Sequence, residues 1–123
     1  MDWDYKHFTP DEFDSPDSPG SGVFMNPVFM KKLELARGIA GIPFVITSGF
    51  RTAHHNKTVN GKDNSSHLSG FAADLFITND KRLLQTITAL FIAGFTRIGL
   101  STEDKFIHVD CDPNKLPAYW GYS

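Results

Sequence analysis

The sequence of 123 residues has one cysteine, no long apolar run and no marked excess of either charge. The lone Cys111 excludes an internal disulfide, so the fold must depend on its core, with or without a bound ion. With 12 basic and 14 acidic side chains, the net charge of −2 lacks the positive field typical of proteins that bind nucleic acid or anionic membranes. We therefore expect neither of these as a partner.

Export signals are missing as well. The sequence has no stretch of about twenty apolar residues, which a membrane-spanning helix would need. Its first residues, MDWDYKHF, are acidic and aromatic, whereas a signal peptide is basic and then apolar. We expect a chain without a signal peptide or transmembrane segment that is made in the cytoplasm.

The composition is sufficient for one compact core. Hydrophobic residues make up 41% of the chain and aromatic residues 13%, which at this length can fill a single core but not two independent ones. We therefore expect a single domain over residues 1–123, acting as a monomer.

The first half of the chain predicts a helix, a strand and a long loop. Asn26 and Pro27 have the residue types of a helix cap and a first helical position, and the helix should end near Gly38. Residues 42–50 are rich in β-branched and aromatic side chains, which predicts a buried strand. The polar residues 51–66 predict a long loop, and loops of this length are usually functional or mobile.

The second half predicts a strand over 70–78, a helix over 79–94, and two strands over 96–101 and 106–112 joined as a hairpin. The element order of the whole chain indicates an α+β fold, with a small, mainly antiparallel sheet flanked by helices.

The stretch SSHLSGFAAD, residues 65–74, brings an imidazole and a carboxylate together with small residues between them. Gly70 allows a turn after which His67 and Asp74 could face one cleft. In the alternative, His67 only caps the loop and Asp74 bonds to a neighbouring turn. The residues of this stretch alone leave both interpretations open.

A second polar pair lies on the last predicted strand. Residues two apart on a strand share a face, so His108 and Asp110 should point the same way while Ile107 and Val109 face the core. Burying the polar pair without a partner would be costly, which indicates a solvated cleft or a bound cation. Cys111 would point to the opposite face, as a packed thiol rather than a ligand.

Three of these groups fit a metal centre. His67, Asp74 and His108 would make a set of two histidines and one carboxylate, which with a water in the fourth position is a catalytic zinc arrangement.

Arg51 follows the strand predicted over 42–50, and its planar guanidinium is suited to a carboxylate or a developing oxyanion. Its alternative role is a surface ion pair. His54 and His55 are predicted to be loop residues rather than ligands, because two adjacent histidines rarely reach one ion.

Three segments in this order, SGFRTAHHN, NSSHLSGFAADL and GFTRIGLSTEDKFIHVDCD, resemble the zinc D-Ala-D-Ala carboxypeptidase family, peptidase family M15, which includes phage endolysin peptidases. The resemblance extends over nearly the whole chain and is to the short single-domain members found in phages and prophages. The family pattern S-x-H-x-x-G-x-A-x-D is complete here, at Ser65, His67, Gly70, Ala72 and Asp74.

The resemblance implies that His67, Asp74 and His108 are the zinc ligands. It implies that Arg51 holds a substrate carboxylate or polarises the scissile carbonyl. It also implies the small α+β fold of the hedgehog signalling domain and the DD-peptidases, with the metal over an antiparallel sheet.

The chain departs from the family at one position. Many members carry an acidic general base three residues before the last ligand, where this sequence has Lys105. Asp110 is then the first choice as catalytic acid, either as the base or as a group that orients a ligand. Glu103 or Asp104 could act instead if the hairpin bends inward.

The sequence thus predicts a zinc-dependent peptidase that hydrolyses peptidoglycan stem peptides, as a D-Ala-D-Ala carboxypeptidase or an endolysin-type endopeptidase. The expected partner is a cell-wall peptide, reached after phage-type release or lysis. The alternative is a catalytically inactive, zinc-stabilised module that binds the cell wall or belongs to a virion.

Overall fold

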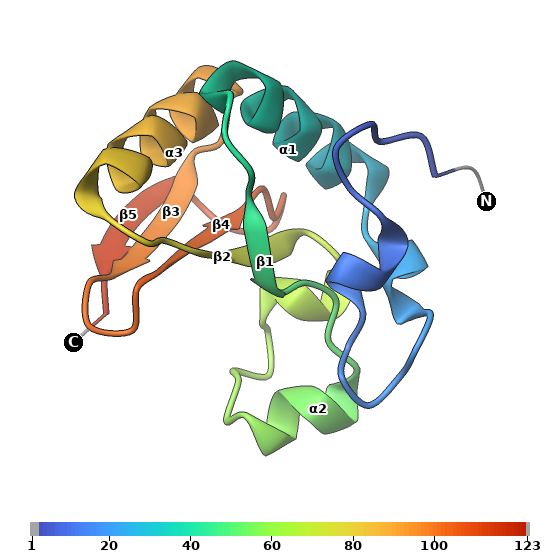
Figure 1. The fold of residues 1–123 in the computed structure, drawn as a ribbon. Helices are drawn as coiled ribbons and strands as arrows, with labels where there is room; N and C mark the ends of the chain where they lie inside the picture. Colours follow the sequence, from blue (N-terminus) through green and yellow to red (C-terminus); the bar gives the residue numbers. More distant parts are fainter. Residues whose placement is uncertain (1–2, 123) are drawn as a thin grey trace.

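The computed structural model describes residues 3–122, which form a five-stranded sheet and three α-helices (Figure 1). The strands are β1 Val45–Ser48, β2 Ala72–Phe76, β3 Arg97–Ser101, β4 Phe106–Asp110 and β5 Ala118–Gly121. They lie in the order β1-β2-β4-β3-β5, and every neighbouring pair is antiparallel except β3 and β5. The predicted α+β class and mainly antiparallel sheet are confirmed.

The helices are α1 Pro27–Ala40, α2 Ala53–Thr58 and α3 Asp80–Ile92. Three short 3-10 turns accompany them: η1 Pro10–Phe13, η2 Ser21–Phe24 and η3 Ser66–Ser69. None of the helices in residues 3–122 is both long and apolar enough to cross a membrane.

The long helices begin where their cap residues predict. The side chain of Asn26 accepts a hydrogen bond from the Val28 amide at the start of α1, and Asn79 caps α3 in the same way. α1 ends two residues beyond Gly38, near which its end was predicted. The helix continues to Ala40 and ends at Gly41, whose φ of 67° suits the left-handed residue of a helix C-terminus.

The strand predicted over residues 42–50 is shorter and less buried than expected. The buried side chains of this segment, Ile42 and Phe44, precede β1, and Val45 on the strand itself is 52% exposed. β1 is an edge strand, so its residues lack a neighbouring strand on one side.

The polar segment 51–66 is not a structureless loop. Thr52 caps α2 by accepting a hydrogen bond from the His55 amide. The buried side chain of Asn56 then donates to the Lys62 carbonyl. The helix was missed because five of its six residues are polar and give no apolar periodicity, and its position depends on these polar hydrogen bonds instead.

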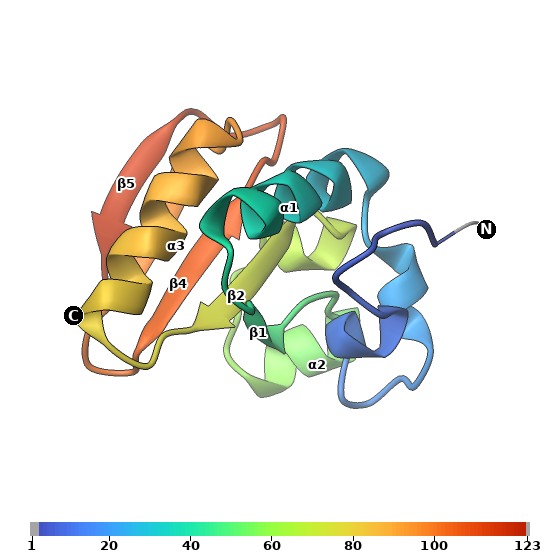
Figure 2. The ribbon, with the colours of Figure 1, turned by 45° about the horizontal axis from the view of Figure 1, so that its top comes forward.

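The two faces of the sheet differ in composition. Ala73, Leu75, Ile98, Ile107 and Val109 point into the core that α1 and α3 cover. Figure 2 shows the two helices side by side across this face. Strand alternation places Asp74, His108 and Asp110 on the opposite face. The functional side chains therefore stand on a rigid sheet whose other face is fixed by packing.

Candidate metal site

The centre of the polar face is a row of residues that runs across all five strands of the sheet. In register, Ser48 of β1 lies opposite Asp74 of β2, Asp74 opposite His108 of β4, and His108 opposite Gly99 of β3. Trp120 of β5 continues the row beside Gly99. Directly opposed residues of a sheet share a face, so strand register alone brings Asp74 and His108 together.

His67 comes from η3, outside the sheet. Gly70 ends this turn with a φ of 76°, and a Cβ there would lie 2.6 Å from the Phe24 carbonyl oxygen, so glycine meets both a conformational and a spatial need. The His67 ring is buried, and its Nδ1 donates to the Gly49 carbonyl oxygen at 2.8 Å. The other ring nitrogen, Nε2, then carries the lone pair that faces the sheet.

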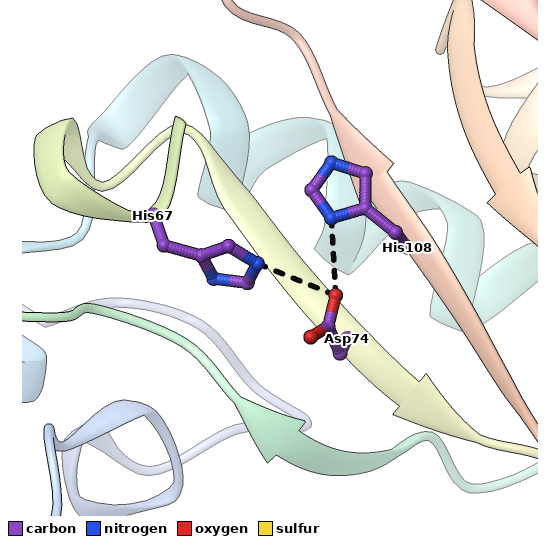
Figure 3. Close-up of side chains that lie close together, drawn as sticks. All are labelled: His67, Asp74 and His108. Atoms are coloured by element: carbon purple, nitrogen blue, oxygen red, sulfur yellow. Dashed lines mark hydrogen bonds and ion pairs between the residues drawn. The ribbon is translucent and has the colours of Figure 1, made fainter. Parts of the chain in front are cut away.

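His67, Asp74 and His108 converge on one point (Figure 3). Asp74 Oδ1 lies 3.3 Å from His67 Nε2 and 3.0 Å from His108 Nδ1. The three donor atoms all lie within 4.8 Å of one another. Ligands about 2.0–2.2 Å from a tetrahedral zinc ion stand about 3.3–3.6 Å apart, so the observed separations are close to those of a zinc site.

The hydrogen bonds of the two rings fix which nitrogens face this point. His108 Nε2 donates to Asp110 Oδ2 at 2.7 Å, so in the neutral ring Nδ1 bears the lone pair. His67 Nε2, His108 Nδ1 and the Asp74 carboxylate are therefore three acceptors directed at one another. Such a cluster is repulsive unless a proton or a cation occupies its centre, and the donor set thus fits a divalent metal.

The electrostatics of the site agree with this conclusion. Burial on its own would raise the pKa of Asp74, but the His108 and His67 rings beside its carboxylate hold the pKa below its ordinary value. Burial would lower the pKa of His108, but the Asp110 and Asp74 carboxylates raise it. Both directions are those that favour a positive charge between these side chains.

Asp110 is 1% exposed, and each of its oxygens is engaged. Besides the bond from His108, its Oδ1 accepts from Arg97 Nε at 2.8 Å and from the Asp112 amide at 3.2 Å. Burial would raise the pKa of Asp110, but the hydrogen bonds from His108 and the Asp112 amide, together with the charges of His108 and Arg97, outweigh burial and lower the pKa. This geometry is that of a carboxylate that orients a histidine.

Arg51 lies beside the other oxygen of Asp74. One of its terminal nitrogens is 3.6 Å from Asp74 Oδ2, and the guanidinium also donates to Ser48 Oγ and Asn56 Oδ1. The side chain is 15% exposed and lines the cavity described next. Arg51 is therefore within the site and not in a remote surface pair.

The cavity above these residues has a volume of about 790 Å³. Four basic side chains line it, namely Arg51, Lys62, Arg97 and Lys115, against two acids, Asp74 and Asp110. An aromatic wall of Phe106, Trp120 and Tyr122 forms another part. Glu103, Asp104 and Lys105 are exposed on the hairpin turn and do not line this cavity.

Other candidates fall outside the metal cluster. His54 and His55 lie on α2 and are not among the residues that could hold an ion within residues 3–122. Cys111 packs against the hydrophobic core, as its strand alternation predicted.

Arg97, Lys115, Trp120 and Tyr122 were not singled out from the sequence. Arg97 could have been found, because strand alternation and the hairpin register place it opposite Asp110. The other three belong to the C-terminal segment, where the sequence predicted no element.

Comparison with known protein families identifies a match over most of the chain. The family model described as Peptidase M15 matches residues 6–110, which include the three converging side chains, Arg51 and Asp110. No curated protein matches the chain.

Proposed function

The chain belongs to the peptidase M15 family, and from this premise we propose that it is a zinc-dependent enzyme that cleaves peptide bonds in peptidoglycan stem peptides. The members of this family are metallopeptidases, which implies that the substrate is a peptide. The main support for a zinc site is that one donor atom each from His67, Asp74 and His108 converge at the cavity.

His67, Asp74 and His108 would hold the zinc ion. When bound, zinc supplies Lewis acidity that polarises a carbonyl and makes water a stronger acid. The remaining tasks fall to the protein. The Gly49 carbonyl keeps the proton of His67 on Nδ1, and Asp110 keeps that of His108 on Nε2, so both ligand nitrogens stay free.

Arg51 would act on both the ligand and the substrate. Its proximity to Asp74 Oδ2 supports a role in directing Oδ1 towards the two histidines. Its guanidinium also faces the cavity, where it can pair with a substrate carboxylate or stabilise charge that develops on the scissile carbonyl.

The charge of the cavity favours an anionic peptide. Four basic residues against two engaged acids give the cavity a positive balance, although the whole chain carries a net charge of −2. Stem peptides bear free carboxylates, which such a cavity would attract. We extend the proposal to a monomeric single domain that reaches the cell wall after lysis or phage-type release.

The test is hydrolysis of purified stem peptides, with D-Ala-D-Ala and L-Ala-D-Glu bonds assayed separately by mass spectrometry. We expect cleavage that a chelator abolishes and zinc restores. His67→Ala and Asp74→Asn should lose stoichiometric zinc, whereas the matched variant His54→Ala should keep it. Undiminished zinc in both ligand variants would refute the proposed ligand set.

A second candidate is a zinc-stabilised module that binds the cell wall without cutting it. The observation in its favour is that the carboxylates lining the cavity, Asp74 and Asp110, are both engaged, while Glu103 and Asp104 lie outside it. Stoichiometric zinc and binding to cell walls, without cleavage of any stem peptide, would support this function over the enzyme.

A further inference from the structure

Arg97 on β3 connects the metal site to the C-terminal segment. Its Nε donates to Asp110 Oδ1 at 2.8 Å, and a terminal nitrogen donates to the Leu116 carbonyl at 2.5 Å. Because Asp110 holds His108 through its other oxygen, an unbroken chain of hydrogen bonds runs from Leu116 to a proposed zinc ligand.

Leu116 and Trp120, which contact Arg97, lie beyond residue 110, where the match to the family model ends. The Trp120 ring covers the guanidinium at 5.0 Å and also contacts the His108 ring, with 5.5 Å between ring centroids. Gly99 makes this possible, since a Cβ there would lie 2.4 Å from Trp120 Nε1. Arg97 is thus held in place by hydrogen bonds to Asp110 and Leu116 and by the ring of Trp120.

From these contacts we propose that Arg97 is a positioning residue for the metal site, and that β5 and the loop before it hold Arg97 in place. The proposal rests on the proposed zinc function. The guanidinium is a rigid planar fork, so fixing it at Leu116 and Trp120 also fixes the Asp110 carboxylate. Asp110 in turn determines the ring orientation of His108 and keeps its Nδ1 unprotonated.

The test is the zinc dissociation constant of Arg97→Gln, measured by competition with a chromophoric chelator. Loss of such an outer contact typically weakens metal binding about 10–100-fold, and we expect a loss in this range. Arg82→Gln, on α3 and outside the cavity, is the matched control and should bind zinc like the wild type. A dissociation constant for Arg97→Gln within twofold of the wild-type value would overturn the proposal.

The melting temperature of the metal-free protein separates positioning from a merely structural role. A structural role would lower this temperature and leave the zinc dissociation constant unchanged, which contradicts the proposal. If Arg97→Gln does not fold, the zinc dissociation constant of Arg97→Lys is measured instead. Its single ammonium cannot reproduce the two bonds of the fork, so zinc binding should weaken several-fold, and an unchanged constant would refute positioning.

A double variant tests whether Arg97 acts through Asp110. Adding Arg97→Gln to Asp110→Asn should weaken zinc binding no further, and fully additive losses would contradict the relay. Failure of the positioning role of Arg97 can be distinguished from failure of the proposed peptidase function. Wild-type protein that binds zinc but cuts no stem peptide would end the peptidase proposal, yet the zinc constants of the Arg97 variants would still test the positioning role.

Discussion

Replacement of Asp110 by asparagine tests how the site keeps His108 in the form that can bind a metal. The carboxylate accepts hydrogen bonds from three N–H groups, those of His108, Arg97 and the Asp112 backbone. Asparagine offers only one acceptor oxygen, and its NH2 group is a donor. Whichever way the amide is turned, the NH2 group faces either His108 or Arg97.

The cost follows from these contacts. A buried donor left without an acceptor costs about 1–3 kcal/mol. If the His108 ring instead accepts from the amide, its proton moves to Nδ1, the nitrogen that should bind the metal. Either arrangement weakens zinc binding, and we expect a loss of about 10–100-fold. This loss corresponds to about 1.4–2.7 kcal/mol of binding free energy.

The assay combines the zinc dissociation constant with kcat on a stem peptide at saturating zinc. Asp104→Asn, an exposed acid on the neighbouring hairpin turn, is the control and should match the wild type in both. If Asp110→Asn keeps wild-type zinc affinity but loses most of its kcat, then Asp110 acts as the general base and the orienting role is wrong.

Three further predictions concern the metal, the sheet and the thiol. Free zinc at 100 times its dissociation constant should stabilise the fold by about 2.7 kcal/mol, which raises the Tm of a domain this size by about 10 °C. Equal melting curves with chelator and with zinc would contradict this linkage. Gly99→Ala should cost about 1–3 kcal/mol in urea unfolding through overpacking against Trp120 and Tyr122, and the penalty should become smaller in a Trp120→Ala background, which removes the nearest of these contacts. Burial raises the pKa of the Cys111 thiol to about 11, so iodoacetamide at pH 7.5 should modify it far more slowly than a cysteine peptide, and equal rates would refute this.

The sequence was informative where local rules determine the structure. Alternation along residues 106–110 correctly assigned Ile107 and Val109 to the core and His108 and Asp110 to the other face. The helix cap Asn26 marked the start of α1 for the same reason, because capping depends on a few neighbouring residues.

The missed elements depend on contacts distant in sequence. β5 has only four residues, follows Pro117 and is largely exposed, so it is too short for alternation to mark it. It exists because it pairs with β3, and this pairing depends on the Gly99 site that accommodates Trp120. The contact between Arg97 and Leu116 could not be predicted without this strand.

The different origins of the three donor atoms have a consequence for metal exchange. Asp74 and His108 belong to central strands, so the folded sheet already presents a half-site with two donors. His67 comes from a turn of four residues, which can open locally at a smaller cost in free energy than the sheet. Opening of η3 would reduce three-point chelation to two-point chelation without unfolding the domain. The release rate of the ion should therefore follow hydrogen exchange of the η3 amides and not the global unfolding rate.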